Sequence, residues 1–157
     1  MKRIMIDKYL VKKNRTIKEA MQKIDENKKR FCIVVDEDNK LCGTVTDGDI
    51  RRGLLKGKRI EDPVCFIQQK DYVAVKTTDD FRTITNIFQE PRILFIPIVD
   101  DANILHNIIT KRQAHVLTLQ EAHYDSQMDF DSLDESILDH QIVQKPWGYY
   151  EIGALPL

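Results

Sequence analysis

The chain has 157 residues and a formal net charge of −1 at pH 7, which favours one compact domain or two small subdomains. A nearly neutral chain has no electrostatic drive towards nucleic acid, and no apolar run approaches the roughly 20 residues of a membrane span. The N-terminus lacks the apolar region of a signal peptide, and the three cysteines have no metal-ligand spacing. We therefore expect a cytoplasmic protein that binds neither nucleic acid nor a membrane.

The first part of the chain carries alternating strand and helix signals. Residues 1–13 alternate basic and apolar side chains and predict a leading strand. Thr16 followed by Glu19 has the pattern of a capping box, which predicts a helix from Ile17. The apolar run Phe31–Val35 predicts a strand that is buried on both faces. The helix carries an apolar stripe at the spacing of a core-facing surface, formed by Ile17, Ala20, Met21 and Ile24.

The segment Gly43–Ile50 joins the end of a short strand to the start of a helix. Free backbone N–H groups at a helix start can hold a phosphate, and the Thr46 hydroxyl can donate one more hydrogen bond. The carboxylate of Asp49 can accept from a pair of sugar hydroxyls. The alternative is that Thr46 and Asp47 merely cap the helix.

This segment belongs to an internal repeat. A shift of 64 residues places Phe31–Asp36 on Phe95–Asp100 and Thr46 on Thr110 without a gap. Each half reads strand, helix, strand, turn, strand and helix. Because units of this size cannot each bury a satisfactory core alone, we expect the two halves to pack against each other.

The second half repeats the elements with some changes. A strand is expected at 73–75, and Thr78, Asp79 or Asp80 caps the next helix, whose apolar face is Phe81, Ile84, Ile87 and Phe88. A buried strand follows at 93–99. Pro97 lies inside this strand, and its missing N–H predicts a bulge or an unpaired side at that residue.

The second copy of the Gly43–Ile50 segment is weaker in polar chemistry. Asn107 stands in place of Gly43, and the uncharged Gln113 stands in place of Asp49. Lys111 and Arg112 add positive charge beside Thr110. The second site is therefore expected to be vacant, or suited to a more anionic ligand that makes no carboxylate contact to a ribose.

The repeated unit resembles the CBS domain, named for cystathionine β-synthase, and the tandem resembles a CBS pair. The resemblance is carried by Ile33–Asp36, an apolar strand ending in Val-Val-Asp, and by Gly43–Ile50, which reads Gly-Thr-Val-Thr-Asp-Gly-Asp-Ile where the family's signature is Gly-h-h-Thr-x-x-Asp-h. It covers roughly residues 8–118. The run Thr46–Arg52 is also similar to pairs attached to sugar-phosphate isomerases and sugar-1-phosphate nucleotidyltransferases.

The resemblance implies an α+β fold of two β-α-β-β-α units, 1–63 and 64–118, packed by their sheets around a pseudo-two-fold axis that leaves two clefts. It implies a ligand-sensing module that binds AMP, ADP, ATP or a nucleotide-sugar, forms a homodimer and regulates an attached or partner sugar-phosphate enzyme. At the matching positions, Asp49 would hold the ribose, and Thr46 with the N–H groups of Gly48 and Asp49 would hold the phosphate. Thr110, Lys111 and Arg112 would line the second cleft.

The last part of the chain changes in composition. Residues 119–144 read as an acidic linker with at most one short helix, near 132–140. Val143–Glu151 contains Pro-Trp-Gly and resembles the start of the cupin domain of mannose-6-phosphate isomerases and mannose-1-phosphate guanylyltransferases. We therefore interpret 145–157 as a truncated cupin-like tail. Two alternatives stay open, a regulatory fragment of such an enzyme and a ligand-free dimerisation scaffold.

The sequence contains none of the catalytic motifs considered next. The four histidines have no i, i+4 arrangement, and the chain has no P-loop and no Gly-x-Ser-x-Gly motif. Asp47 and Asp49 lie two residues apart at a helix start and point in different directions, so they cannot act as a general acid–base pair. The sequence predicts a binding protein without catalytic residues, metal or cofactor.

Overall fold

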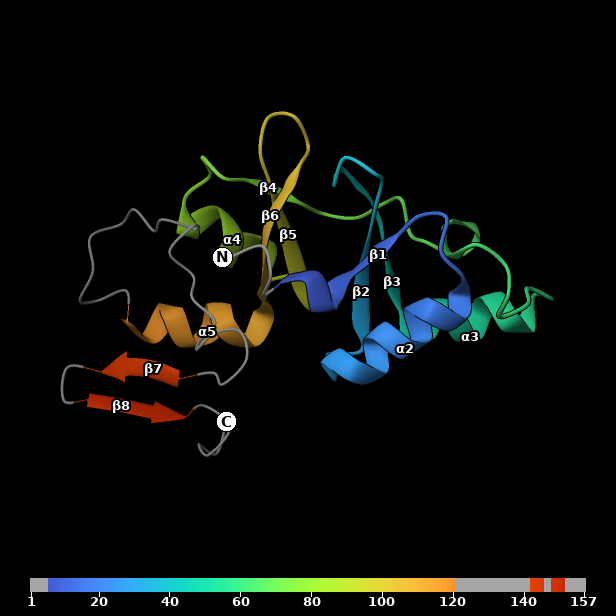
Figure 1. Cartoon of the computed structure of the whole chain (residues 1–157). Helices are drawn as coiled ribbons and strands as arrows, with labels where there is room; N and C mark the ends of the chain where they lie inside the picture. The colour runs from blue at the N-terminus through green and yellow to red at the C-terminus, as the bar shows by residue number, and fades with distance from the viewer. Residues whose placement is uncertain (1–5, 121–141, 146–147, 152–157) are drawn as a thin grey trace. The chain divides into compact units, whose positions relative to one another are not determined.

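The structure is a computed structural model that describes residues 6–120, 142–145 and 148–151. These residues divide into two compact units, each built around its own three-stranded sheet (Figure 1). The first unit comprises residues 6–73 and Asp101–Leu105. The second comprises Ala74–Asp100 and the described residues from His106 onwards.

The first unit has a sheet of order β1-β2-β3, in which β1 runs parallel and β3 antiparallel to the central strand β2. Its elements in chain order are the 3₁₀ turn η1 (Asp7–Tyr9), β1 (Leu10–Lys12), α2 (Ile17–Asn27), β2 (Phe31–Val35), β3 (Leu41–Thr46), α3 (Asp47–Leu55) and the 3₁₀ turn η2 (Val64–Phe66). All five side chains of β2 are buried, which confirms the predicted strand with two covered faces. Both helices contribute to one core cluster with the strands.

One member of the predicted apolar stripe on α2 is wrong. Ile17, Ala20 and Ile24 are buried as expected, but Met21 is 40 % exposed. Met21 lies at the edge of the stripe, where the helix surface turns away from the sheet and towards solvent. The remaining three side chains are enough to fix the face on which α2 packs.

The predicted capping box at the start of α2 is confirmed. The Glu19 N–H donates to Thr16 Oγ1 at 3.1 Å, and the Thr16 N–H donates to Glu19 Oε2 at 2.8 Å. Thr16→Ala is expected to lower the free energy of unfolding by about 1 kcal/mol, because an N–H at the helix start loses its acceptor. Urea titration followed by circular dichroism measures the change. The matched control is Thr78→Ala, which removes the same atoms from an exposed turn and should leave the urea midpoint within experimental error.

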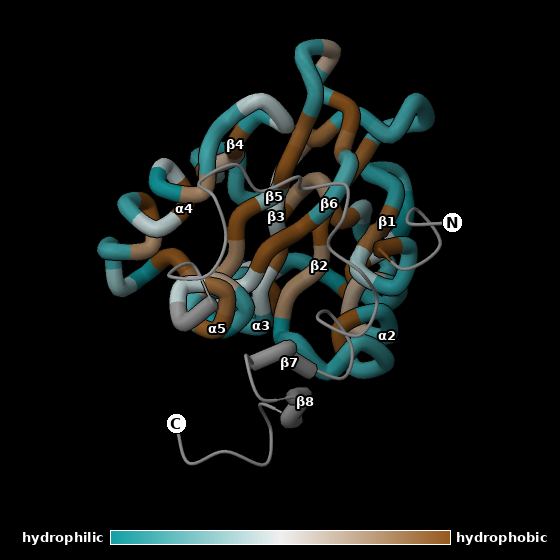
Figure 2. Tube along the Cα trace, turned by 90° about the vertical axis from the view of Figure 1, so that its left-hand side faces the viewer, coloured by the Kyte–Doolittle hydropathy of each residue, from teal (hydrophilic) through white to brown (hydrophobic). Residues whose placement is uncertain are grey.

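The second unit repeats this plan with a sheet of order β4-β5-β6. Its elements are β4 (Val75–Lys76), α4 (Phe81–Ile87), β5 (Phe95–Val99), β6 (Leu105–Thr110), α5 (Lys111–Gln120) and an antiparallel hairpin of β7 (Ile142–Lys145) and β8 (Gly148–Glu151). Asp80 caps α4 by accepting from the Thr83 N–H at 2.9 Å, which settles the choice among the three candidate caps. In Figure 2 the strands of both sheets are mostly apolar and the loops mostly polar.

The strand pairings follow the 64-residue repeat. Val11 pairs with Val34 and Lys12 with Val35 in the first sheet, and the positions 64 residues later pair as Val75–Ile98 and Lys76–Val99. The first sheet has one more such pair, Leu10 with Ile33, and its counterpart in the second would join Ala74 to Pro97. The paired stretch of β4 begins just after this position, as expected for a proline that has no N–H to donate. This explains why β4 begins at Val75, later than the strand predicted at 73–75.

The polar linker prediction is only partly testable on the described residues. Helix α5 extends to Gln120, two residues into the linker predicted at 119–144. Strand β7 begins at Ile142, before the predicted end of this linker. The short helix expected near 132–140 and the Pro146-Trp147 pair lie outside the described residues. Strand β8 begins at Gly148, directly after that pair. The division into four segments, with its three boundaries, therefore stays a prediction.

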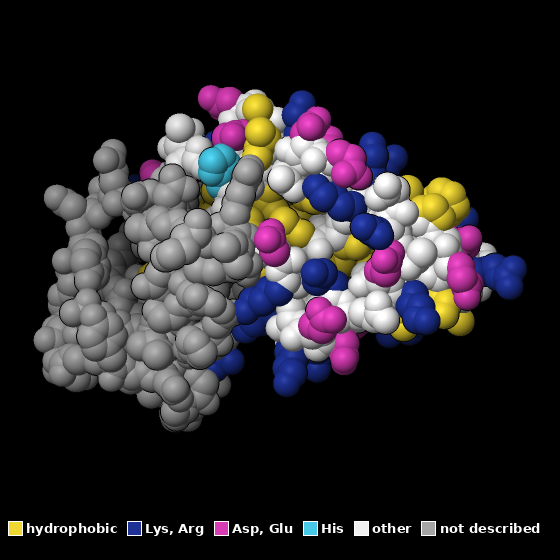
Figure 3. All heavy atoms as spheres, viewed as in Figure 1, with side chains coloured by type: hydrophobic (Ala, Val, Ile, Leu, Met, Phe, Trp, Pro, Cys, Tyr) yellow, Lys and Arg dark blue, Asp and Glu magenta, His cyan; other side chains and the backbone are white. Residues whose placement is uncertain are grey.

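The charged side chains of the described part are mixed in sign. On the face shown in Figure 3, Lys and Arg alternate with Asp and Glu over the described residues. In the part of the chain that the structure describes, no helix is both long and apolar enough to cross a bilayer.

Candidate functional site

The start of α3 is closed by a second capping box, in which Asp49 is the acidic partner. The Asp49 N–H donates to Thr46 Oγ1 at 3.3 Å, while the Thr46 N–H and hydroxyl both donate to Asp49 Oδ2, at 2.9 and 3.0 Å. Thr46 therefore caps the helix, as one of the two interpretations of this segment expected. The partner of the cap is Asp49, whereas Asp47 is exposed.

The other oxygen of the Asp49 carboxylate faces two side chains. Oδ1 accepts from Arg52 Nη2 at 2.8 Å and from Gln69 Nε2 at 2.9 Å. With two bonds on each oxygen, all four acceptor positions of the carboxylate are taken. Asp49 is 4 % exposed, whereas the Arg52 side chain is 54 % exposed. A buried carboxylate is thus held by a short network of hydrogen bonds that reaches the surface at Arg52.

Two opposing effects act on the pKa of Asp49. Burial raises the pKa of this carboxyl, but hydrogen bonds from the Thr46 N–H, Gln69, Arg52 and the Thr46 hydroxyl outweigh it, so that the pKa lies below its ordinary value of 3.8. The side chain is therefore ionised at neutral pH, and both of its oxygens act as hydrogen-bond acceptors.

This lowered pKa predicts an acid-dependent stability. A carboxyl whose pKa is lower in the folded state stabilises the fold above the unfolded value of about 4, and the contribution is lost as pH falls through the folded pKa. Asp49→Asn removes this dependence. Urea titrations at pH 7, 5, 4 and 3 should show a difference in unfolding free energy between wild type and Asp49→Asn that is largest at pH 7 and shrinks below pH 4. A difference that stays constant over this range would contradict the prediction.

A cavity of about 210 Å³ opens beside Asp49, between α3 and the segment that follows η2. It is lined by Asp49, Arg52, Gly53, Lys56, Lys58, Phe66, Ile67, Gln68 and Gln69. The segment is fixed to β3 by two backbone hydrogen bonds, from the Thr44 N–H to the Gln69 carbonyl at 3.1 Å and from the Gln69 N–H to the Thr44 carbonyl at 2.8 Å. The position of Gln69 against Asp49 is therefore set by backbone pairing.

The lining of this cavity combines positive charge with hydrogen-bonding groups. Arg52, Lys56 and Lys58 are exposed cations, and Lys58 Nζ lies 5.2 Å from the centroid of the Phe66 ring. Gln68 Oε1 is buried without a hydrogen-bond partner. Pockets that enclose drug-sized ligands have about 300–1,000 Å³. A nucleotide would therefore be held partly inside the cavity and partly over its basic rim.

The sequence-predicted residues of the first site are brought together only in part. Asp49 lines the cavity, whereas Thr46 and Gly48 are half-buried in the first turn of α3 and are not among the lining residues. The Thr46 hydroxyl and the Asp49 N–H, both expected to contact a phosphate, are bonded to each other. Sequence reasoning missed Arg52, Gln68 and Gln69; the signal for Arg52 was its i, i+3 spacing from Asp49.

In the second unit, Gln113 takes the place of Asp49. The Thr110 N–H donates to Gln113 Oε1 at 2.7 Å, and the Gln113 N–H donates to Thr110 Oγ1 at 3.2 Å. Gln113 is 2 % exposed. Lys111 directs its Nζ to the Glu90 carbonyl at 3.3 Å, and Arg112 is exposed. The capping geometry is retained without a charge, and the lining of a second cleft by Thr110, Lys111 and Arg112 stays a prediction.

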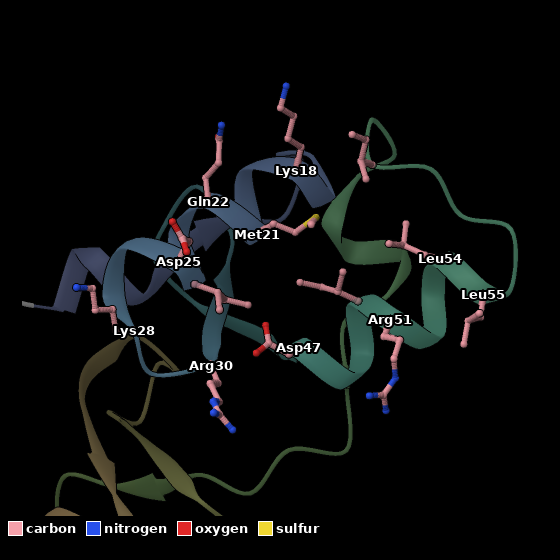
Figure 4. A pocket seen from close by; sticks show the side chains of 13 residues that line it. Lys18, Met21, Gln22, Asp25, Lys28, Arg30, Asp47, Arg51, Leu54 and Leu55 are labelled. Carbon is pink, nitrogen blue, oxygen red and sulfur yellow. The ribbon is translucent and has the colours of Figure 1, made fainter.

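A larger groove of about 1,090 Å³ lies between α2 and α3 in the first unit. Figure 4 shows Met21 pointing into it, while Lys18, Gln22 and Arg51 point away. Its charged lining residues have both signs. Because Asp49 is not among the residues lining this groove, we place the candidate site at the smaller cavity.

The described histidines and acids form no metal cluster. Among the residues that the structure describes, no three His, Cys, Asp or Glu side chains are grouped as metal ligands. His106 Nε2 lies 2.9 Å from Asp100 Oδ2. His123 and His140 lie outside the described residues.

Comparison with known proteins identifies the repeated unit. Residues 1–56 match the family model of the CBS domain. Protein MJ1225 from Methanocaldococcus jannaschii, described as a putative archaeal homolog of g-AMPK, is 26 % identical with a TM-score of 0.63, over 72 % of this chain and 46 % of that one. CBSX2, solved in complex with AMP, is 20 % identical with a TM-score of 0.62, over 73 % of this chain and 89 % of that one.

The two in-register repeats thus define a tandem of small α+β units. The family match identifies a CBS domain in the first unit, and the structural likeness shows that the two units have the fold of CBS pairs. The α+β fold class predicted from the sequence is confirmed as well.

The chain spans about a fifth of the length of the two curated relatives described here. A homoserine O-acetyltransferase of Methanobrevibacter ruminantium is 34 % identical over 107 residues, which is 67 % of this chain and 21 % of that protein. An inosine-5'-monophosphate dehydrogenase of Nitrosopumilus maritimus is 28 % identical over 110 residues, which is 69 % of this chain and 22 % of that protein.

Proposed function

We propose that this CBS pair is a regulatory module that senses an adenosine nucleotide, bound at the cavity beside Asp49. The observation that carries the proposal is a buried, ionised carboxylate in the lining of a cavity that three cations also line. A carboxylate suits the vicinal hydroxyls of a ribose, and the cations suit a phosphate chain. A structurally similar CBS protein solved with AMP supports the choice of an adenosine nucleotide.

In the proposed complex the ribose lies against Asp49 and the phosphates lie over the rim of Arg52, Lys56 and Lys58. In this proposal the Gly48 N–H at the start of α3 supports the phosphate nearest the ribose. Thr46 and the Asp49 N–H, predicted for the same role, would take part only by giving up their mutual hydrogen bond in the helix cap. Gln68 offers an amide to the base at the inner end of the cavity. Phe66 is 57 % exposed and offers a ring on which a base can stack.

Regulation requires that the ligand prefers one arrangement of the module over another. The similar segments in a dehydrogenase and an acetyltransferase support a module that acts on an attached or partner enzyme. From the likeness of Thr46–Arg52 and of Pro146-Trp147-Gly148 to sugar-phosphate and nucleotide-sugar enzymes, we propose that this enzyme belongs to that class. We also propose a homodimer, which light scattering on the purified protein tests directly.

A thermal-shift screen tests the ligand class. AMP, ADP and ATP are expected to raise the melting temperature by several degrees at concentrations far above Kd, because binding to the native state alone stabilises it. S-adenosylmethionine, a nucleotide-sugar and GMP complete the panel. Calorimetry on the best ligand should give one site per chain, since Gln113 supplies no carboxylate in the second unit. If no adenosine nucleotide shifts the melting temperature, the proposal fails, and if no compound of the panel does, the result favours the ligand-free scaffold.

A further inference from the structure

We propose that Arg52 and Gln69 occupy the Asp49 oxygen at which a ribose would bind, as long as the protein is free of ligand. When a nucleotide binds, Arg52 leaves this oxygen and moves to the phosphate. Arg52 would then determine whether the site prefers nucleotides to nucleosides. This inference rests on the proposed nucleotide site and deepens it.

The two oxygens of Asp49 differ in their freedom to change partners. Oδ2 accepts from the Thr46 N–H and hydroxyl, which are part of the cap that fixes the start of α3. Oδ1 accepts from the ends of two long side chains, Arg52 and Gln69, both exposed. A ribose diol can therefore approach Asp49 at Oδ1 without breaking the helix cap.

The exchange keeps the buried carboxylate satisfied. Two ribose hydroxyls would replace two side-chain donors, so that Asp49 has four hydrogen bonds before and after binding. A buried carboxylate left without donors would be costly, which makes a one-for-one exchange the favourable route. Arg52 then needs another anion for its guanidinium.

The position of Arg52 makes a phosphate the natural replacement. A Cβ built on Gly48 would lie 3.1 Å from Arg52 Nη1 and 3.2 Å from Nη2, so the guanidinium lies against the first turn of α3. At the start of α3 the Asp47 and Asp49 N–H groups are bonded, to the Arg30 carbonyl and to Thr46 Oγ1, so the Gly48 N–H and the positive end of the helix dipole are the features that favour an anion at this place. A guanidinium beside them can bind phosphate oxygens in bidentate fashion. Gly48, which has no side chain, leaves room for this approach.

Arg52 should have opposite effects on the binding of adenosine and of AMP, and this difference can be tested. When adenosine binds, Arg52 only competes with the ribose for Asp49. When AMP binds, Arg52 competes in the same way but also gains a contact with the phosphate. Arg52→Met should therefore leave adenosine affinity unchanged or raise it, while AMP affinity falls. The ratio of AMP to adenosine affinity is expected to drop by about tenfold or more, the range of a charge-assisted contact. For Arg52→Lys, which keeps the charge but cannot bind in bidentate fashion, this ratio should lie between those of wild type and Arg52→Met.

The experiment is calorimetry with AMP and with adenosine on wild type, Arg52→Met, Arg52→Lys and Arg51→Met. Arg51 is an exposed arginine on the same helix that does not line the cavity, so Arg51→Met should keep the wild-type ratio. If wild type binds AMP and Arg52→Met weakens AMP and adenosine equally, or weakens neither, the inference fails and the nucleotide site stands. If wild type binds neither compound, the proposed function fails and the inference fails with it.

Discussion

Asp49→Ala is expected to lower the affinity for AMP by about 100-fold. The alanine removes both hydrogen bonds from the ribose hydroxyls to a charged oxygen, and each such bond contributes about 1.5–3 kcal/mol. Isothermal titration calorimetry at constant ionic strength measures the change directly. The ionic strength is held constant because the basic rim contributes to binding through screened charges.

The matched control is Asp47→Ala, two residues earlier on the same helix. Asp47 is exposed, lines the groove between α2 and α3 and does not line the cavity beside Asp49. AMP affinity should therefore stay within a factor of about two, the range of a distant surface charge. Because Asp49→Ala also removes the capping partner, its folding is checked by circular dichroism, and Asp49→Asn serves as a second variant that keeps an oxygen for the Thr46 N–H. Equal AMP binding by wild type and both Asp49 variants would refute the assignment.

Gly43→Ala is expected to reduce stability by about 1–3 kcal/mol, the usual range for an overpacked site, and to weaken AMP binding at the same time. A Cβ on Gly43 would lie 2.7 Å from the backbone oxygen of Gln69 and about 3 Å from the Gln68 side chain. The backbone oxygen can yield only if the segment moves away from β3. Since Gln68 and Gln69 line the cavity, the movement would also shift the groups that face the ligand.

Urea titration and calorimetry on the same preparation separate these two effects. The control for stability alone is Gly48→Ala, because the atoms nearest to its added Cβ belong to the end of the flexible Arg52 side chain, the first at 3.1 Å. AMP affinity is not compared for this variant, since Gly48 belongs to the proposed phosphate site. Alanine is the better helix former by about 1 kcal/mol, so this variant should be as stable as wild type or more so. If Gly43→Ala matches wild type in both stability and AMP affinity, the close approach of β3 and Gln69 does not hold the site.

The fold could be predicted where its cause is local. The capping box at Thr16 and Glu19 and the continuous apolar run of β2 each act within a few residues, and both are confirmed. The repeat extended these signals to the second unit, down to the strand register. Met21 was misjudged because it faces the groove between α2 and α3, and spacing within one helix does not reveal whether a neighbouring element fills such a place.

The candidate site was predictable only in its helical half. Asp49 follows from the strand-to-helix pattern, whereas Gln69 reaches it from 20 residues along the chain through pairing with β3. That pairing depends on Gly43, since any side chain there would meet the Gln69 backbone. Periodicity within an element carries no information about such a contact. Arg52 was missed for a different reason. Its partner Asp49 was interpreted only as a residue that contacts the ligand, so no partner within the protein was sought for it.

The two copies of the helix cap differ by one titratable group. An amide at Gln113 cannot gain a proton as the pH falls, while the carboxylate at Asp49 gains one in strong acid, because its pKa lies below the ordinary value of 3.8. Lowering the pH should therefore loosen the two halves of the chain in sequence, with the backbone amides of the first turn of α3 exchanging with deuterium before those of α5. One half of the duplicated chain would respond to acid at its helix start, and the other would keep the same shape without that response.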